Sequence, residues 1–488
     1  MEDKLEKIHE TALKILKDIG INLLHPEVLD LVQQKGVKVS GKRAFLKPEQ
    51  VMHWVHKAPS KFTLYAKNPK NNTVIGDDNV LCSPGYGCAQ IIMADGNRRD
   101  SLLSDYIAFA KLTHQCEDLN LNGGILAQPC DVPSDKSHLI MLYAAILHSD
   151  KCLIGMPAVG EKMQEIMDMM ALLCGGKERL IQKPRILIPI SIHSPLQIDE
   201  MSLQAMLVTA RHGQAMNISP APAAGTTGPI SLAGNLALAN AETLAGIAVA
   251  QMISEGTPVL FGLQASIADL KTGKILIGSP AFNLQGLYGA RLARKYGLPI
   301  RGSGNTTDAN WISVQSGYES MMSMLVAFQN KVNVIVHSAG ILDAFAAMSY
   351  EKYLVDLEII RSVKSFLHDI EISEDNLSID VIKEVGPGGE FLTTLDTLNK
   401  VRTHTWNSEL HINEQTLDRP LNDQLIEVLH AKLQRMLDSF QKPGLDADVQ
   451  NQLERYLVQA GVDHKIIDAI KKKERRDNND LWQSRYGN

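Results

Sequence analysis

The sequence predicts a (β/α)8 TIM barrel with helical additions at both ends. Between about residues 80 and 363, a short apolar strand, a turn rich in Gly, Pro, Ser or Asn, and a helix recur eight times, a repeat typical of such barrels. The strands are apolar on both faces, which is typical of a covered parallel sheet. A doubly wound open sheet is the alternative, but that fold has fewer strands and a switch point.

The repeat gives each element a position. The predicted strands cover residues 80–83, 119–126, 152–156, 185–191, 215–219, 258–262, 298–302 and 333–337. The predicted helices begin near residues 103, 134, 161, 199, 230, 280, 311 and 349. Several have start signals, such as Ser279 followed by Pro280 in the first turn. Residues 89–93 compete with 80–83 for the position of the first strand.

The two ends of the chain differ from the barrel segment, which we place at residues 76–370. Residues 1–75 are predicted to be a helical addition, because apolar residues recur with helical spacing over 5–16, 26–35 and 48–56. The C-terminal region, residues 371–488, starts with an acidic stretch, and its Gly-Pro-Gly-Gly sequence at 386–389 predicts a tight turn. Surface helices are predicted after it over 420–440, 446–460 and 465–473.

The composition narrows the class of protein. The chain has 488 residues, 44% of them hydrophobic, and a net charge of −6, which argues against a nucleic-acid binder. Its six cysteines all lie within the first 174 residues and make no disulfide framework, as expected of a reduced cytoplasmic protein. Neither a secretory signal nor an uncharged apolar run of membrane length is visible, so no membrane partner is expected.

Common cofactor motifs are missing from the sequence. It has no Walker A loop, and Gly302-Ser303-Gly304 lacks the third glycine of a dinucleotide fingerprint. Cys82 and Cys88 are not spaced as a zinc pair, although zinc bound by them with Cys130 or His193 is an alternative to buried structural thiols. The chain also lacks an Asp-x-His-x-x-Gly sequence, so no resident cobalamin-binding module is predicted.

Polar side chains cluster where the predicted strands end. They are Tyr86, Gln128, His193, Ser219, Thr226, Gln264, Asn305, Asp308, His337 and Ser338. In a TIM barrel these ends meet at one mouth, where active sites lie. Each residue alone has a structural alternative; His193 and His337, for example, could simply cap strands. Glu319 and Tyr318, in the helix after the seventh strand, are expected to serve helix packing.

Four segments in this order resemble the trimethylamine methyltransferase superfamily. They are Arg-Gly-Ser-Gly-Asn-Thr-Thr-Asp at 301–308, Gln-Ser-Gly-Tyr-Glu-Ser at 315–320, Ser-Ala-Gly at 338–340 with Ser-Tyr-Glu at 349–351, and Gly-Pro-Gly-Gly-Glu-Phe-Leu at 386–392. The founding members carry pyrrolysine after the eighth strand, where residues 339–343 here are ordinary. The chain therefore resembles the non-pyrrolysine relatives, such as glycine betaine methyltransferase. Glu390 is a second departure, since histidine is expected there.

This resemblance implies methyl transfer from a quaternary amine, glycine betaine or a related betaine, to Co(I) of cobalamin carried by a separate corrinoid protein. A quaternary ammonium expels a neutral tertiary amine, so neither pyrrolysine nor a metal bound by this chain is required. The sequence does not choose among glycine betaine, proline betaine, carnitine and γ-butyrobetaine. The resemblance is also compatible with a homodimer or a larger assembly.

The resemblance also suggests roles for candidate residues on the cationic side of the substrate. Tyr86, Trp311, Tyr350 and Phe345 are candidates for cation–π contact with the trimethylammonium group. Asp308 would add electrostatic attraction, and we place it in the predicted catalytic set.

Other candidates face the rest of the substrate. Arg301, or backbone N–H groups of the glycine-rich loops, would meet a carboxylate; the alternative for Arg301 is a salt bridge inside the barrel. His337 and Asn305 complete the catalytic set by lining the pocket, and His193 joins the substrate-binding set. Two other functions compete: a zinc-dependent corrinoid methyltransferase for methanol or a thiol, and a betaine-binding protein without turnover.

Overall fold

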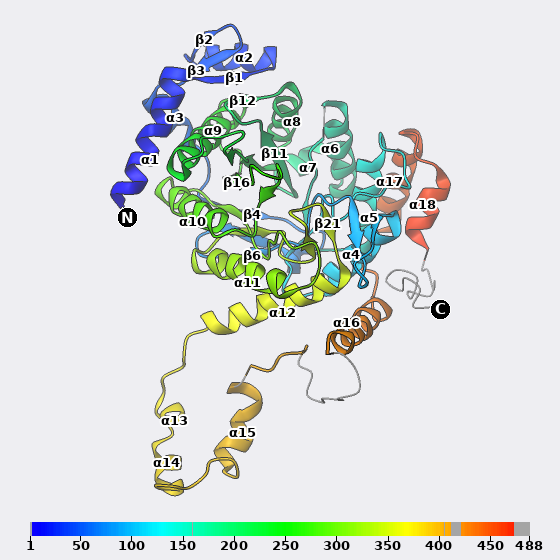
Figure 1. The fold of residues 1–488 in the computed structure, drawn as a ribbon. Coiled ribbons are helices and arrows are strands. Elements are labelled where there is room, and N and C mark those ends of the chain that lie inside the picture. The colour runs from blue at the N-terminus through cyan, green and yellow to red at the C-terminus, as the bar shows by residue number, and fades with distance from the viewer. Residues whose placement is uncertain (1, 159, 405, 411–420, 473–488) are drawn as a thin grey trace.

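A closed barrel of eight parallel strands forms the centre of the protein (Figure 1). The computed structural model describes residues 2–158, 160–404, 406–410 and 421–472. The barrel strands are β6 (Leu81–Cys82), β9 (Leu121–Gly123), β10 (Cys152–Ile154), β11 (Ile186–Ile192), β13 (Ala215–Pro220), β15 (Val259–Phe261), β18 (Arg301–Ser303) and β19 (Val334–Val336). Every one overlaps a predicted strand, so the barrel prediction is confirmed.

Neighbouring strands follow one another in chain order around the barrel. Five of them, from β9 to β15, form one parallel sheet, and β18, β19 and β6 form another. A parallel bridge between Phe261 and Ile300 joins the two sheets on one side. On the other side, the backbone N–H of Asn120 donates to the carbonyl of Cys82 over 2.8 Å. These two contacts close the ring, which excludes the open-sheet alternative.

A ring of helices surrounds the strands (Figure 1). They are α4 (Leu103–Gln115), α5 (Ser137–His148), α6 (Gly160–Cys174) with the short α7 (Lys177–Ile181), α8 (Glu200–Arg211), α9 (Leu232–Ile253), α10 (Pro280–Lys295), α11 (Val314–Gln329) and α12 (Tyr350–Leu367). Serine or aspartate side chains cap the N-termini of α8 to α12 by accepting a backbone N–H. The predicted helix positions are thus confirmed within a few residues.

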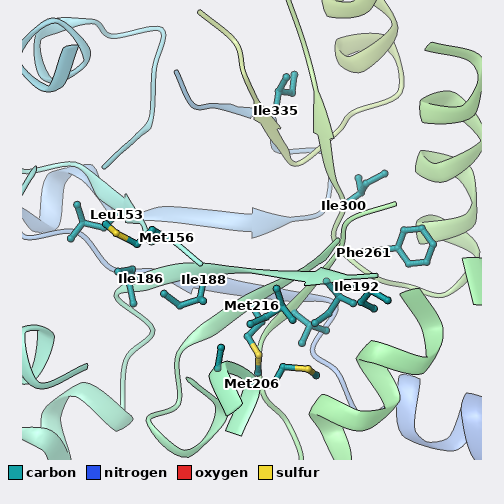
Figure 2. Close-up of a cluster of buried hydrophobic side chains, with 14 of the residues drawn as sticks. Leu153, Met156, Ile186, Ile188, Ile192, Met206, Met216, Phe261, Ile300 and Ile335 are labelled. Atoms are coloured by element: carbon teal, nitrogen blue, oxygen red, sulfur yellow. The ribbon is translucent and has the colours of Figure 1, made fainter. Parts of the chain in front are cut away.

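Alternate residues of each strand pack on opposite sides of the barrel wall. Outward-facing side chains such as Ile186, Ile188 and Ile192 belong, with Met206 of α8, to the core between strands and helices (Figure 2). Inward-facing Leu187 belongs instead to a second apolar cluster inside the barrel. A hairpin of β4 (Lys61–Leu64) and β5 (Thr73–Gly76) adds its own residues to this inner cluster. The inner cluster supports the mouth from below.

The N-terminal addition contains the three predicted helices, together with short strands that the sequence does not predict. It holds α1 (Glu2–Lys14), the π-helical turn η1 (Ile15–Ile19), α2 (Pro26–Gln34) and α3 (Pro48–Val55), and it has three further strands before the β4–β5 hairpin. The strands β1 (Ile21–Leu23), β2 (Lys38–Ser40) and β3 (Arg43–Phe45) form a sheet in which β3 lies between β2 and β1. Strand β1 also pairs with β12 (Gln197–Ile198), which follows barrel strand β11. Strands of three residues are too short to leave a readable period.

The N-terminal helices explain the composition of α9. In the described part of the chain, α9 alone is long and apolar enough to cross a membrane, and 94% of that apolar window is buried. Helices α1, α2 and α3 all pack against α9, which lies between them and the barrel. A helix that is apolar on every side is here buried in the core between the N-terminal helices and the barrel.

Short strands form a second layer beyond the barrel strands. One sheet combines β20 (Ile341–Leu342), β21 (Ala347–Met348), β7 (Gln90–Ile92) and β8 (Arg98–Asp100). The other combines β14 (Ala223–Ala224), β16 (Ser266–Ala268) and β17 (Ile275–Leu276). Each follows the carboxyl end of a barrel strand, so both rim the mouth. Residues 89–93, the competing first strand, form β7 in this rim.

The C-terminal region has two parts. Helices α16 (Leu421–Asp438), α17 (Ala447–Gln459) and α18 (His464–Lys471) pack against α4, α5, α6 and α12 on the outside of the barrel. Before them, α13 (Glu374–Leu377), α14 (Ile379–Val385) and α15 (Leu395–His404) project away from the barrel (Figure 1). The three surface helices predicted after residue 420 are present, whereas the division of the chain at residues 75 and 370 stays a prediction.

Candidate active site at the barrel mouth

Four of the predicted residues gather at the carboxyl ends of the first, seventh and eighth strands. The Tyr86 and His337 rings meet edge to face, with their centroids 6.4 Å apart. The Phe345 ring lies 4.3 Å from the His337 ring. The Nη2 atom of Arg301 lies 3.4 Å from the Nε2 atom of His337. The chain thus brings one cation, one imidazole and two further aromatic rings together where the sequence predicts a pocket.

Arg301 lies inside the barrel. It pairs in register with Val334, whose side chain belongs to the inner apolar cluster, so both face the interior. The Arg301 side chain is almost completely buried, and its Nε and Nη1 atoms have no hydrogen-bond partner. Burial lowers the pKa of Arg301 to about 10, so the guanidinium stays charged at neutral pH. A buried cation with free N–H donors is well suited to binding an anion.

His337 is neutral, and its geometry fixes which nitrogen carries the proton. Burial, together with the nearby positive charge of Arg301, lowers the pKa of His337 well below its ordinary value. Arginine can only donate, so Nε2 of His337 accepts and the ring proton lies on Nδ1. That Nδ1 is buried without a partner. The residue also adopts a left-handed backbone with φ of 64°. His337 therefore offers a second free N–H.

Phe345 ends a strained turn. Asp343, Ala344 and Phe345 have successive φ values of 49°, 50° and 75°, which L-residues adopt at a cost. Backbone hydrogen bonds to Ala309 and Thr307 hold the turn, at 2.8 and 3.1 Å. The Asp343 carboxylate also pairs with Arg98 and Lys274 from the rim. Backbone strain of this kind persists only where the surrounding contacts enforce it. Here those contacts hold the Phe345 ring beside His337.

Tyr86 lies across the top of the inner apolar cluster. Its hydroxyl donates to the carbonyl of Gly155 over 3.1 Å, and burial raises the pKa of the phenol, so Tyr86 stays uncharged. Gly124 makes room for the ring, because a Cβ at that position would lie 2.4 Å from the Tyr86 side chain. The tyrosine is therefore positioned by its hydroxyl at one end and by a glycine beneath the ring.

The interior of the barrel opens to solvent above the inner cluster. Ser191 lies on the same face of β11 as Leu187, yet Ser191 is exposed whereas Leu187 is buried. Further round the mouth, Gln264 donates to the hydroxyl of Ser303 over 2.8 Å, and Ser219 donates to the carbonyl of Gly262. Sequence reasoning included Gln264 and Ser219 but missed Ser191 and Ser303, which only the inward alternation of the strands identifies.

Two predicted catalytic residues bind the protein's own loops. Asn305 is fully buried and donates to the carbonyls of Ser338 and Asp356, at 2.6 and 3.1 Å, instead of lining the mouth. Asp308 accepts the backbone N–H groups of Ile277 and Gly278. Partial burial nevertheless raises the pKa of Asp308. Neither side chain joins the Arg301–His337 cluster, so their positions indicate structural roles in the wall.

The remaining predicted residues also lie apart from the cluster. His193 has an exposed side chain 3.2 Å from the carboxylate of Asp199, and Trp311 is partly exposed in the loop before α11. Tyr350 is buried outside the barrel, where its ring stacks on Phe109 at 4.4 Å and its hydroxyl donates to Asp105. The predicted cation–π role of Tyr350 therefore does not fit the structure.

A buried ion pair supports the loop that follows β19. Lys352 and Asp356, one turn apart on α12, are fully buried and paired with each other. The carboxylate of Asp356 accepts the backbone N–H of Gly340 over 2.7 Å, and Lys352 also donates to Ser320 over 2.9 Å. Sequence reasoning missed this pair, although two opposite charges four residues apart on an apolar helix face were a readable signal.

The cysteines considered for zinc differ in their surroundings. Cys82 and Cys88 are buried, and burial raises the pKa of Cys82 to about 12, whereas Cys130 is exposed. Within the described residues, no three His, Cys, Asp or Glu side chains are grouped as metal ligands. Zinc binding requires a deprotonated thiolate, which burial disfavours.

Comparisons with known proteins all find similarity to methyltransferases. A family model described as trimethylamine methyltransferase (MTTB) matches residues 1–461. Glycine betaine methyltransferase of Desulfitobacterium hafniense is 40% identical over 462 residues, covering 94% of this chain and 96% of that protein. The trimethylamine methyltransferase MttB of Methanosarcina barkeri is 29% identical over 463 residues, covering 92% of each.

Among solved structures, the monomethylamine methyltransferase (MtmB) of Methanosarcina barkeri is similar with a TM-score of 0.53. The similarity covers 89% of this chain and 88% of that one at 10% sequence identity. At this identity the likeness concerns the fold alone, and it agrees with the barrel described above.

Proposed function

Because this chain belongs to the trimethylamine methyltransferase family, we propose that it transfers a methyl group from a carboxylate-bearing quaternary amine to a Co(I) corrinoid. The observation that carries the proposal is Arg301, a buried cation with two unpartnered nitrogens beside two aromatic rings. A betaine has the complementary pair of groups, one anionic and one cationic. Trimethylamine has no carboxylate and would leave the guanidinium unpaired.

Each end of the betaine has a partner in the cluster. Arg301 donates to the carboxylate, and the free Nδ1–H of His337 adds a neutral hydrogen bond. The faces of Tyr86 and Phe345 stabilise the trimethylammonium group by cation–π contact, worth about 0.5–2 kcal/mol. Because that is too little for strong selection, the carboxylate contact provides most of the discrimination.

The reaction is a direct displacement at a methyl carbon. Co(I) of the corrinoid, the methyl acceptor, supplies the electron pair for the new Co–C bond. The C–N bond breaks with its electrons moving to nitrogen, so a neutral tertiary amine leaves and no proton is transferred. A neutral His337 and an uncharged Tyr86 fit this chemistry, since neither has to act as an acid. The role of the chain is to orient the betaine toward Co(I) and to exclude water.

The corrinoid is carried by a partner protein that docks at the mouth. The solvent-accessible interior above Leu187 gives the acceptor an approach from outside the barrel. We propose glycine betaine as the substrate, because the 40% identical relative carries that name. Proline betaine, carnitine and γ-butyrobetaine are the alternatives, since they share the two charged groups.

A substrate panel tests this proposal. Purified protein is incubated with Co(I) cobalamin and, in turn, with glycine betaine, the three longer or cyclic betaines, tetramethylammonium and trimethylamine. We expect methylcobalamin from one betaine at a rate at least tenfold above those of the two amines that lack a carboxylate. Equal or faster turnover of trimethylamine would overturn the proposal, and binding of a betaine without methyl transfer would favour a non-catalytic binding protein.

A further inference from the structure

We infer that residues 369–404, here called the arm, form an interface with a second copy of this chain. The arm leaves the barrel after α12 and comprises α13, α14 and α15 (Figure 1). It is held together by polar contacts of its own, such as the pairing of Lys400 with Asp375 at 3.0 Å. None of its side chains belongs to the apolar core clusters of the described residues.

The arm exposes apolar side chains to an unusual degree. Of the 26 exposed large apolar side chains in the described chain, 13 lie between residues 366 and 406. Nine exposed apolar residues of the arm are assigned to the proposed interface: Ile370, Ile372, Leu377, Ile379, Ile382, Phe391, Leu392, Leu395 and Leu398. Leu392, Leu395 and Leu398 are 79%, 76% and 69% exposed. Apolar patches of this size on a soluble protein mark an interaction site.

The exposed area matches that of a stable protein interface. At about 100 Å² for each of these nine side chains, the arm offers roughly 900 Å², against the about 800 Å² per partner that a stable complex buries. Its helices are too short to be stable alone, with 4, 7 and 10 residues. The arm therefore requires a permanent partner, whose interface is more apolar than that of a transient complex.

The position of the arm points to a second copy rather than to the corrinoid protein. Near the end of α12, Arg361 and Lys364 pair with Asp118, which immediately precedes β9. The arm thus starts at the amino-terminal edge of the barrel strands, opposite the mouth. A partner that delivers a methyl acceptor to the mouth is therefore separated from the start of the arm by the length of the barrel.

The charge of the arm indicates which surface it meets on the second copy. Between residues 369 and 392 it carries seven acidic residues and one lysine, Lys383. Two such arms side by side would repel each other. Each arm is therefore expected to pack against the body of the other copy, an exchange that a two-fold symmetric dimer allows.

Sedimentation of the full chain tests the inference. The variant combines Leu392→Ser, Leu395→Ser and Leu398→Ser, and the control combines Ile19→Ser, Ile181→Ser and Met201→Ser at exposed positions elsewhere. We expect the wild type and the control to share a mass of at least twice 53.7 kDa. The arm variant should have half that mass or less while its circular dichroism stays unchanged. A monomeric wild type, or an arm variant of wild-type mass, would overturn the inference.

Cross-linking of the wild type gives a test that does not depend on folding of a variant. Equal amounts of ¹⁴N- and ¹⁵N-labelled protein are mixed, unfolded and refolded together, and then treated with a lysine cross-linker. Lys383 is exposed and lies in the arm, so mixed-isotope pairs that include Lys383 are expected. Links of Lys383 confined to a single isotope, with the corrinoid protein absent or present, would contradict a second copy as the partner.

Discussion

The chemistry proposed for the mouth depends on the charge states of two adjacent side chains. Burial lowers the pKa values of both Arg301 and His337, but from different starting points. Arg301 falls only to about 10 and stays cationic, whereas His337 falls further below neutrality and stays uncharged. The pair therefore presents one positive charge and one neutral donor to the substrate over the whole physiological range.

This charge distribution predicts how betaine binding depends on pH. Between about pH 6 and 9 the Kd of glycine betaine should be constant, because neither residue titrates there and the quaternary nitrogen has no proton. As pH rises toward 10, Arg301 loses its proton and the Kd should increase. Titration calorimetry at several pH values measures this. A transition near pH 6.5 would instead show that His337 is protonated in the free protein.

Replacing Arg301 separates carboxylate recognition from recognition of the ammonium group. In Arg301→Met, kcat/KM for glycine betaine should fall about 10- to 100-fold, the effect of a lost hydrogen bond to a charged group. Tetramethylammonium, which lacks a carboxylate, should be used by the variant at least as well as by the wild type, because the variant has no guanidinium to leave unpaired. The comparison is internally controlled, because a general folding defect would lower turnover of both compounds alike.

Substitutions at Tyr86 test the aromatic contact. Tyr86→Phe keeps the ring and loses only the hydrogen bond to Gly155, whereas Tyr86→Ala removes the ring. We expect Tyr86→Ala to lower methylcobalamin formation about 2- to 30-fold, as a cation–π contact of 0.5–2 kcal/mol implies. Tyr86→Phe should remain closer to wild type. Equal losses in the two variants would assign Tyr86 a role through its hydroxyl instead.

At the level of elements, the eight strands were predictable and several loop orientations were not. Strands buried on both faces leave a continuous apolar signal, and the helices have capping residues at their starts. The direction of Asn305 follows from its left-handed backbone, with φ of 51°, which the sequence does not reveal. Tyr350 lies on the face of α12 that packs on α4, and only the rotation of the helix in the fold decides that.

The Lys352–Asp356 pair should matter as a unit. In Lys352→Met, Asp356 keeps its place in a fully buried site without its cation, and the cost is about 3–5 kcal/mol of stability. The double variant Lys352→Met, Asp356→Leu removes both charges and should be less destabilised than the single variant. Thermal unfolding of the three proteins at pH 7.5 measures the difference. A double variant that unfolds at or below the temperature of the single variant would contradict this account.

At the level of the whole molecule, the mouth and the start of the arm lie at opposite ends of the barrel. The rim strands and the four-residue cluster form one end of the barrel, and the arm begins at the other end. The sequence pointed to the Gly-Pro-Gly-Gly segment as a family feature but did not show that the surrounding apolar residues lack a core of their own. Which surfaces remain uncovered depends on the complete packing of the chain.

Following the transferred methyl group gives the most direct measurement of methyl transfer from a betaine to Co(I). The wild-type protein is incubated with Co(I) cobalamin and glycine betaine carrying ¹³C-methyl groups, and both products are quantified by NMR. We expect labelled methylcobalamin and dimethylglycine in equal amounts, with no such products when the protein is omitted. Dimethylglycine without methylcobalamin, or neither product from a betaine that the protein binds, would contradict the proposed methyl transfer.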